Sequence, residues 1–282
     1  MSPEAEEFIE LLQLELAQHE LELTSYPAVA LQIQQLLADD NVSTERVVRL
    51  VGTEPILAAM IVRLASSVAL NPTGKPVVDL RNAVARVGFN AMRAAATSFA
   101  LTQLRLSKRY RPVLEQLEAL WRDNVSMAAA ACVVARRSQR VSADTALFAG
   151  LVSGVGKICL LARSVDSPYM MSHPDEFREV VLDWHAEVAH ALLTSWRVAD
   201  DVVEAVHGHQ GHRTGTRNLF VLSDVLSVAE VMAQHEMATD LRLELLESQL
   251  AAKRLGLRPE NYEFMMTESK AELALLIKTL GI

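Results

Sequence analysis

Residues 148–158 read Phe148-Ala149-Gly150-Leu151-Val152-Ser153-Gly154-Val155-Gly156-Lys157-Ile158, so that three glycines interrupt a helical apolar run. Each glycine in a helix interior costs about 1 kcal/mol relative to alanine. We therefore expect that close packing, or a function since lost, explains the presence of glycine at these three positions. The stretch is not a phosphate-binding P-loop, because Leu151 stands where that motif needs its first glycine and Ile158 follows the lysine in place of a hydroxyl residue.

The segment Gly-Leu-Val-Ser-Gly-Val-Gly-Lys, residues 150–157, resembles the signature of the HD superfamily of metal-dependent phosphohydrolases. In that family a His-Asp pair, at the positions of Ser153 and Gly154, holds a divalent metal that generates a hydroxide nucleophile. Serine is a poor neutral ligand and glycine has no side chain, whereas such a site needs imidazole, carboxylate or thiolate ligands. The resemblance therefore implies the scaffold of an HD site without its central ligands.

The composition indicates a soluble, well-packed protein. The chain has 282 residues, half of them hydrophobic, and a formal net charge of −8. It is long enough for one large or two modest domains. No uninterrupted apolar run approaches the roughly 18 residues of a membrane span, and the acidic residues 1–7 do not form a secretory signal. We expect a cytoplasmic protein without a membrane partner.

Two further features of the composition exclude classes of function. The negative charge, with basic clusters no stronger than residues 108–111, disfavours nucleic-acid binding. Cys132 and Cys159 lie in apolar helical contexts, so we expect them to pack as small hydrophobic residues in a reducing cytosol. Neither has a neighbouring base in the sequence, and a nucleophilic enzyme is not indicated.

Apolar residues recur at helical spacing along the whole chain and no segment alternates like a strand, which predicts an all-α protein. The helices form two contiguous clusters, residues 1–107 and residues 108–282, which meet at the basic, proline-containing segment 107–112. In the first cluster we expect helices over residues 4–22, 28–38, 43 onward, 54–67, 79–87 and 90–106, with Thr53, Asp79 and Asn90 as N-terminal caps.

The second cluster is expected to begin with an alanine-rich helix over residues 113–137. The next helix continues through the glycine stretch to about residue 162. A loop over residues 163–176 could then lie over whatever the cluster encloses. Further helices are expected over residues 176–196, 200–209, 216–236, 241–255 and 260–280.

With its helices arranged in two clusters, nearly the whole chain resembles the HDOD family. HDOD proteins are non-catalytic relatives of the HD hydrolases, and they act as signalling output modules. The first cluster carries Leu23-Thr24-Ser25-Tyr26-Pro27-Ala28-Val29-Ala30, Gly52-Thr53-Glu54-Pro55-Ile56-Leu57 and Asn82-Ala83-Val84-Ala85-Arg86-Val87-Gly88-Phe89. The second adds Leu120-Trp121-Arg122, the glycine stretch, His185-Ala186-Glu187-Val188-Ala189, Leu192-Leu193-Thr194-Ser195-Trp196 and Ala205-Val206-His207-Gly208-His209. The order and spacing of these pieces carry the resemblance.

The resemblance places the former metal positions at Asp123, Ser153, Gly154, His185 and His209. Asp123 could still offer oxygen, and His185 and His209 could offer nitrogen, but three ligands without the central pair make a poor site. We therefore expect no bound metal, no other cofactor and no catalytic residue. The alternative for both histidines is that they are hydrogen-bonded helix residues in a former pocket.

A candidate binding surface consists of Lys157, Trp184, His185, Trp196 and His209, because aromatic and cationic side chains are favoured anchors at interfaces. Lys157 resembles the lysine that approaches substrate phosphate in active HD relatives, and it can equally be interpreted as a snorkelling side chain. The competing interpretation of both tryptophans is interior packing.

The run His207-Gly208-His209-Gln210-Gly211-His212 resembles a metal-binding tract. Its glycines instead favour a helix end, where imidazoles bond the terminal carbonyls. Metal ligation would also need a convergent partner from elsewhere in the chain.

Two classes of function remain. The favoured one is a non-enzymatic, bacterial-type signalling or regulatory protein that binds a partner protein, with a nucleotide second messenger as a further candidate ligand. Because no receiver, cyclase or kinase segment accompanies it, we expect its signalling partners in trans. The alternative is a residual metal-dependent phosphohydrolase that acts on a nucleotide or cyclic dinucleotide. The sequence does not name the partner, because a groove between helix faces has no readable motif.

Overall fold

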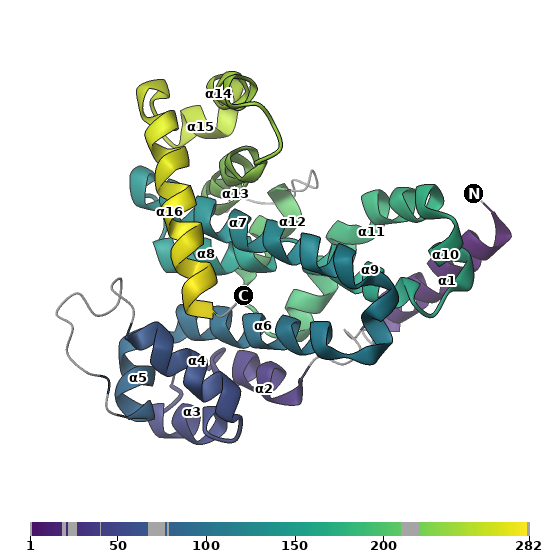
Figure 1. Ribbon diagram of the computed structural model, residues 1–282, viewed down its shortest axis with the longest axis horizontal. Helices are drawn as coiled ribbons and strands as arrows, with labels where there is room; N and C mark the ends of the chain where they lie inside the picture. Colours follow the sequence, from purple (N-terminus) through teal and green to yellow (C-terminus); the bar gives the residue numbers. More distant parts are fainter. Residues whose placement is uncertain are drawn as a thin grey trace.

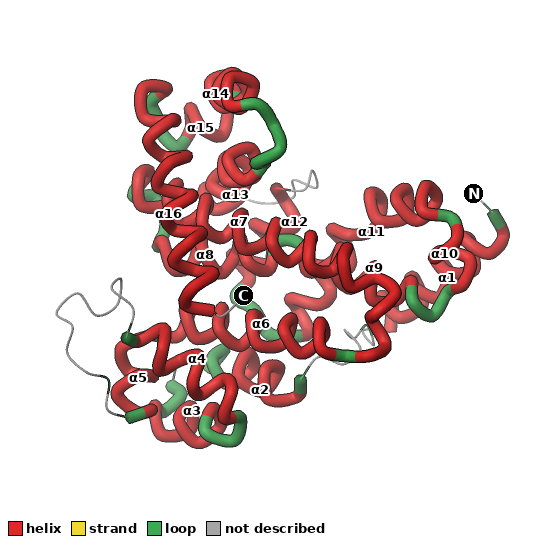
Figure 2. Tube along the Cα trace, viewed as in Figure 1, coloured by secondary structure: helices red, strands yellow, loops and turns green. Residues whose placement is uncertain are grey.

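The computed structural model describes residues 2–18, 21, 27–39, 41–66, 77, 79–209 and 220–280 (Figure 1). Within these ranges every regular element is a helix (Figure 2), which confirms the all-α prediction. The motif residues 23–26 and the run from Gln210 to His212 lie outside the described residues.

The first cluster of helices surrounds a core of its own. Ile33, Leu57 and Ile61 are fully buried there, at the helical spacing that the sequence shows. Asp79 caps the helix Leu80–Val87 as predicted, since its Oδ1 accepts the Asn82 backbone amide at 2.8 Å. The cluster consists of α2 (Ala28–Leu36), α3 (Thr44–Val51), α4 (Pro55–Ala65), α5 (Leu80–Val87) and α6 (Phe89–Leu106).

The predicted capping roles of Thr53 and Asn90 are wrong. The Thr53 hydroxyl donates to the Leu50 carbonyl at 2.7 Å, and the Glu54 side chain accepts the Ile56 amide at the start of α4. Asn90 lies inside α6, and its amide donates to the Thr145 hydroxyl at 3.1 Å. The Thr53 hydroxyl therefore bonds across a turn, and the Asn90 amide bonds to another helix. The positions of these residues in the sequence do not distinguish such partners from a capping role.

The second cluster is built around the long helix α7, against which α8, α13 and α16 pack (Figure 1). Residues 128–131 of α7 are four fully buried alanines, whose small side chains let neighbouring backbones approach closely. The elements are η1 (Lys108–Val113), α7 (Leu114–Ser138), α8 (Ala143–Val152), α9 (Val155–Ser164), α10 (Pro168–Ser172), α11 (Pro174–Ser195), α12 (Asp200–His209), α13 (Phe220–Ala233), α14 (Thr239–Ser248), α15 (Leu250–Arg254), η2 (Pro259–Asn261) and α16 (Tyr262–Leu280).

Three predictions about this cluster are wrong. The glycine stretch is not one helix but two, α8 and α9, with Ser153 and Gly154 in the turn between them. Residues 163–176 are not a loop, because they contain α10 and the start of α11. The helix expected over residues 241–255 is divided at Gln249, whose backbone is extended.

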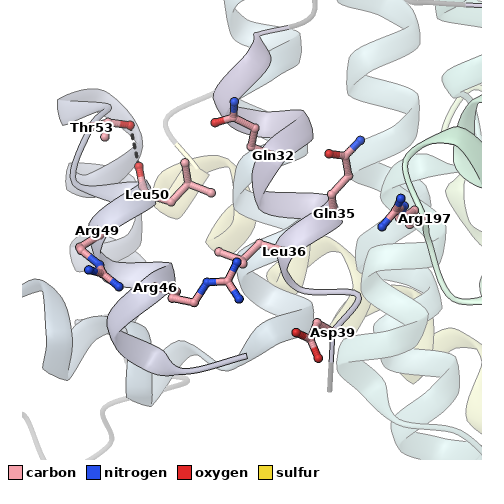
Figure 3. Close-up of a pocket in the computed structure, with 9 residues that line it drawn as sticks. All are labelled: Gln32, Gln35, Leu36, Asp39, Arg46, Arg49, Leu50, Thr53 and Arg197. Carbon is pink, nitrogen blue, oxygen red and sulfur yellow. Dashed lines mark hydrogen bonds between the residues drawn. The ribbon is translucent and has the colours of Figure 1, made fainter. Parts of the chain in front are cut away.

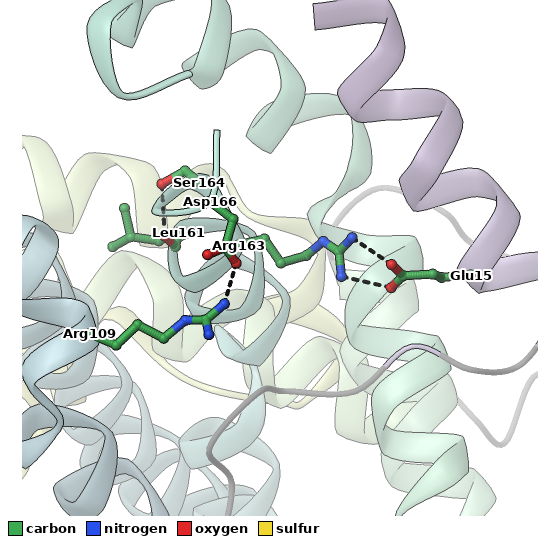
Figure 4. Close-up of polar contacts among 6 residues, drawn as sticks. All are labelled: Glu15, Arg109, Leu161, Arg163, Ser164 and Asp166. Carbon is green, nitrogen blue, oxygen red and sulfur yellow. Dashed lines mark hydrogen bonds and ion pairs between the residues drawn. The ribbon is translucent and has the colours of Figure 1, made fainter. Parts of the chain in front are cut away.

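Helix α1 (Pro3–Gln18) packs with the second cluster, although the predicted division placed it in the first. Its Ala5 and Ile9 are buried with Met170 and Val180, on α10 and α11. Arg163 of α9 also holds both carboxylate oxygens of Glu15, at 2.7 and 2.8 Å (Figure 4). Helix α1 is therefore anchored to helices that are far from it in sequence.

The segment between the clusters is packed, not an exposed linker. Tyr110 of η1 is fully buried, and the neighbouring Arg109 bonds Asp166 after α9 (Figure 4). Helix α6 serves both cores, with Phe99 in the first and Leu104 in the second. The two clusters are thus joined through a shared helix.

Among the described residues, Ala143–Ser164 is apolar and long enough to cross a membrane by length and composition. It corresponds to α8 and α9 with the turn between them, and 83% of the window is buried within the protein. Burial in the core accounts for its apolar character.

Candidate functional site

Close packing explains the glycines of the stretch that the sequence singled out. A Cβ atom at Gly156 would lie 1.9 Å from the His185 carbonyl oxygen, so α9 and α11 are in backbone contact there. A Cβ atom at Gly150 would lie 2.7 Å from the Cα of Ala128, so α8 and α7 are similarly close. Real Cβ atoms do not approach other atoms to these distances. The expectation of close packing is therefore confirmed at both positions.

Asn124 of α7 fills the space at Gly154. A Cβ atom at Gly154 would lie 2.1 Å from the Asn124 Oδ1. The Asn124 side chain is buried, and its Nδ2 has no hydrogen-bond partner among the residues that the structure describes. Ser153 is buried as well, and its hydroxyl donates to the Gly150 carbonyl at 2.7 Å. The two positions that would carry the His-Asp pair are therefore closed by local packing and hydrogen bonding.

The other former site positions still face one another. They come from four helices: Asp123 from α7, Lys157 from α9, His185 from α11 and His209 from α12. The Lys157 charge acts on both Asp123 and His209, and the His185 charge also acts on His209. These four side chains therefore lie within electrostatic reach of one another.

His209 is the most unusual group of the site. Its side chain is only 5% exposed, and neither ring nitrogen has a hydrogen-bond partner among the described residues. The Nδ1 lies 4.0 Å from the Oε2 of Glu230, which is beyond hydrogen-bond distance. Burial, followed by the charges of Lys157 and His185, lowers the pKa of His209 from 6.5 to about 4. His209 is therefore a neutral buried imidazole at physiological pH.

The carboxylates at the edge of the site respond to burial in the opposite direction. Partial burial raises the pKa of Asp123, and Glu236 raises it further while Lys157 lowers it. Partial burial also raises the pKa of Glu230, against the effect of Lys157. Lys157 thus lies within electrostatic reach of both carboxylates.

These residues do not fit a divalent metal. A structural or catalytic site needs three or four converging ligands. The Ser153 hydroxyl is directed to a carbonyl, Gly154 offers nothing, and the His185 Nδ1 donates to the Leu182 carbonyl at 3.2 Å. In the part of the chain that the structure describes, no group of three or more His, Cys, Asp or Glu side chains could hold a metal ion.

The two tryptophans of the candidate surface lie in different surroundings. Trp196 is 4% exposed and belongs to the second core, which agrees with interior packing and not with a binding role. Trp184 is partly buried, and it packs against the cluster that α1 forms with α10 and α11. We therefore leave Trp196 out of the candidate surface.

His207 ends in a different contact from the one expected. Its Nε2 lies 3.1 Å from the Glu187 Oε1 of α11. His190 lies 3.7 Å from Glu204 in the reciprocal arrangement, so two Glu-x-x-His segments face each other across α11 and α12. The spacing of three residues could have indicated this cluster, because such residues share a helix face.

Sequence reasoning also missed Asn124 and Glu230. Asn124 follows Asp123, but nothing in its neighbourhood predicts that it occupies the volume beside a distant glycine.

Cys132 and Cys159 are free and buried as expected, and burial raises the pKa of both thiols to about 12. Neither can act as a thiolate nucleophile near neutral pH.

The model of the HDOD domain matches residues 23–212, about two thirds of the chain. The chain belongs to the HDOD domain family. No curated protein matches it. The HDOD match covers the first cluster and the second as far as α12, so it contains all of the positions at which the resemblance places HD metal ligands.

Several solved structures share this HDOD fold over most of the chain. A Shewanella amazonensis protein, provisionally named a metal-dependent phosphohydrolase, is 24% identical with a TM-score of 0.67 and covers 96% of this chain and 100% of its own. An HDOD domain protein of unknown function from Geobacter sulfurreducens is 19% identical with a TM-score of 0.66, over 98% and 97%. A Marinobacter aquaeolei protein, provisionally named a signal transduction protein, is 22% identical with a TM-score of 0.61, over 93% and 60%. At these identities the likeness shows the fold.

Proposed function

We propose that this HDOD protein is a non-enzymatic signalling module that binds a partner protein at the edge of its former HD site. The observation that carries the proposal is the side chain of Asn124, which occupies the space where a residue at position 154 would present a metal ligand. Without a bound metal there is no low-pKa water to attack phosphorus. Membership of the HDOD family and the name of the Marinobacter relative support a role in signalling.

The proposed contact surface consists of Lys157, His185, Asp123 and Glu230, which we call the rim. Asp123 and Glu230 are exposed, whereas Lys157 and His185 are partly exposed, so all four are available to a partner. Lys157 carries a cation on an apolar stem, which suits an interface because the stem buries area while the ammonium keeps polar contacts. A nucleotide second messenger is a second ligand class that this cation could attract.

Lys157→Ala is expected to weaken binding of the partner by about tenfold, because a charge contact at a partly buried interface contributes roughly 1.5 kcal/mol. The partner is first identified by cross-linking from the native host, and its affinity is then measured with purified proteins by calorimetry. His185→Ala is expected to weaken binding as well.

Two matched controls locate the effect. Lys253→Ala removes an exposed lysine of α15, and Arg63→Ala removes an exposed arginine of α4 in the first cluster. Both are expected to retain the wild-type affinity. If Arg63→Ala abolishes binding while folded Lys157→Ala and His185→Ala bind normally, the partner contacts the first cluster and the rim assignment is wrong.

A further inference from the structure

An open groove of about 640 Å³ lies where α2 and α3 meet the turn that follows α11 (Figure 3). Three arginines line it: Arg46 and Arg49 from α3, and Arg197 from the turn. Figure 3 shows the α3 arginines on one side of α2 and Arg197 on the other. The groove is therefore formed by residues of both helical clusters, and it is separate from the rim.

The positive charge of the groove is not neutralised from within. Among the described residues, Asp39 is the one carboxylate that lines it, and its Oδ1 accepts the backbone amide of Asn41 at 2.9 Å. Across the described residues, neither Arg46, Arg49 nor Arg197 forms an ion pair or hydrogen bond with another side chain. In a protein with a net charge of −8, this local excess of guanidinium groups selects for an anionic ligand.

Among the described residues, the backbone is left-handed at two residues other than glycine, Gln139 and Arg197, and Arg197 lines the groove. The turn after α11 is a Schellman motif, in which the Val198 amide bonds the Leu193 carbonyl and the Arg197 amide bonds the Thr194 carbonyl. Arg197 itself adopts the left-handed conformation, with φ of 55°. Glycine normally takes this position because it has no Cβ penalty.

The same chain uses glycine in the equivalent place elsewhere. After α15, the Leu257 amide bonds the Ala252 carbonyl and the Gly256 amide bonds the Lys253 carbonyl, with Gly256 at φ of 71°. The two turns therefore have the same hydrogen bonds, and the turn that lines the groove carries a strained arginine in place of glycine. Strain of this kind persists at functional positions.

The lining favours a peptide over a nucleotide. Gln32 and Gln35, one turn apart on α2, present amides that can bond a peptide backbone, while the arginines can bond carboxylates. The described lining includes no aromatic side chain on which a nucleobase could stack. The groove is open, unlike the enclosed pockets that bury small molecules.

We propose that this arginine groove binds an acidic segment of a partner protein, with carboxylates placed on Arg46, Arg49 and Arg197. The proposal goes beyond the proposed function, since it assigns a ligand to a second surface whose lining includes no residue of the rim. Loss of peptide binding at the groove would leave the rim proposal standing, and loss of rim binding would leave the groove proposal standing.

The probe is a fluorescein-labelled octaglutamate peptide, followed by anisotropy at low ionic strength. We expect it to bind despite the negative charge of the whole protein, and we expect octaglutamine not to bind. The triple variant Arg46→Gln, Arg49→Gln, Arg197→Gln is expected to bind octaglutamate about tenfold more weakly or worse, because each exposed charge contact contributes a few-fold. Added salt should weaken wild-type binding in the same direction.

A charge-matched triple variant controls for net charge. Arg140→Gln, Arg178→Gln, Arg258→Gln removes three exposed arginines elsewhere and should bind octaglutamate like the wild type. Arg197→Gly should weaken binding while its thermal midpoint stays at or above that of the wild type, because the strain at φ of 55° is relieved. The proposal is overturned if both triple variants weaken equally, if octaglutamate does not bind, or if ATP binds the groove more tightly than the peptide.

Discussion

Gly156→Ala is expected to destabilise the fold by about 3 kcal/mol or more, at or above the upper end of the range for overpacked cores. The added Cβ would lie 1.9 Å from the backbone oxygen of His185, so α9 and α11 would have to move apart. The gain in helix propensity on replacing glycine by alanine, about 1 kcal/mol, is too small to compensate. Urea denaturation followed by circular dichroism measures the loss.

Gly154→Ala tests the same packing where a side chain is the obstacle. Its Cβ would meet the Asn124 side chain, and not backbone, so Asn124→Ala should recover most of the stability that Gly154→Ala loses. Asn124→Ala should not rescue Gly156→Ala. Gly208→Ala is the matched helical control, since the nearest atom to its Cβ is the Ser223 hydroxyl at 3.1 Å, a much longer distance than at Gly156. Wild-type stability in Gly156→Ala would show that α9 and α11 are not in this contact.

His209 is expected to make the fold strongly sensitive to acid. Its native pKa is about 4, compared with 6.5 for an unperturbed imidazole. The unfolded chain therefore binds a proton more readily, and the stability that neutral His209 contributes is complete above pH 6.5 and is lost as the pH falls toward 4. The total is about 3 kcal/mol, since one pKa unit corresponds to about 1.4 kcal/mol.

His209→Leu should remove this dependence. The replacement has a similar volume and leaves no unpartnered ring nitrogen in the interior, so the variant should be at least as stable as the wild type at pH 7. The difference in unfolding free energy between variant and wild type should then grow as the pH is lowered to about 4. A constant difference across this range, or an NMR titration of His209 near pH 6.5, would contradict the assignment.

The sequence was sufficient for the parts of the fold that depend on local patterns. Helical spacing predicted α12 over residues 200–209, and the Asp79 cap followed from its side chain and position. The order of weak motifs was enough to indicate the HDOD family, whose model matches residues 23–212. In each case the information lies within one helix or in a family pattern.

The remaining features depend on contacts between residues that are far apart in sequence. Helix α1 joins the second cluster through Glu15 and Arg163, a pair that no local pattern connects. The break at Ser153 and Gly154 reflects the approach of Asn124 from α7. The sequence does not indicate the arginine groove, because its arginines come from α3 and from the turn after α11 and are far apart in the chain.

The central claim is that the former HD site no longer holds the metal that hydrolysis requires. The most direct test is the metal content of the purified protein after exposure to excess Mn²⁺ and gel filtration, measured by mass spectrometry. We predict substoichiometric metal, with the same trace amount in the double variant His185→Ala, His209→Ala. One or more ions per chain in the wild type that disappear in the double variant would contradict the account and favour a residual phosphohydrolase.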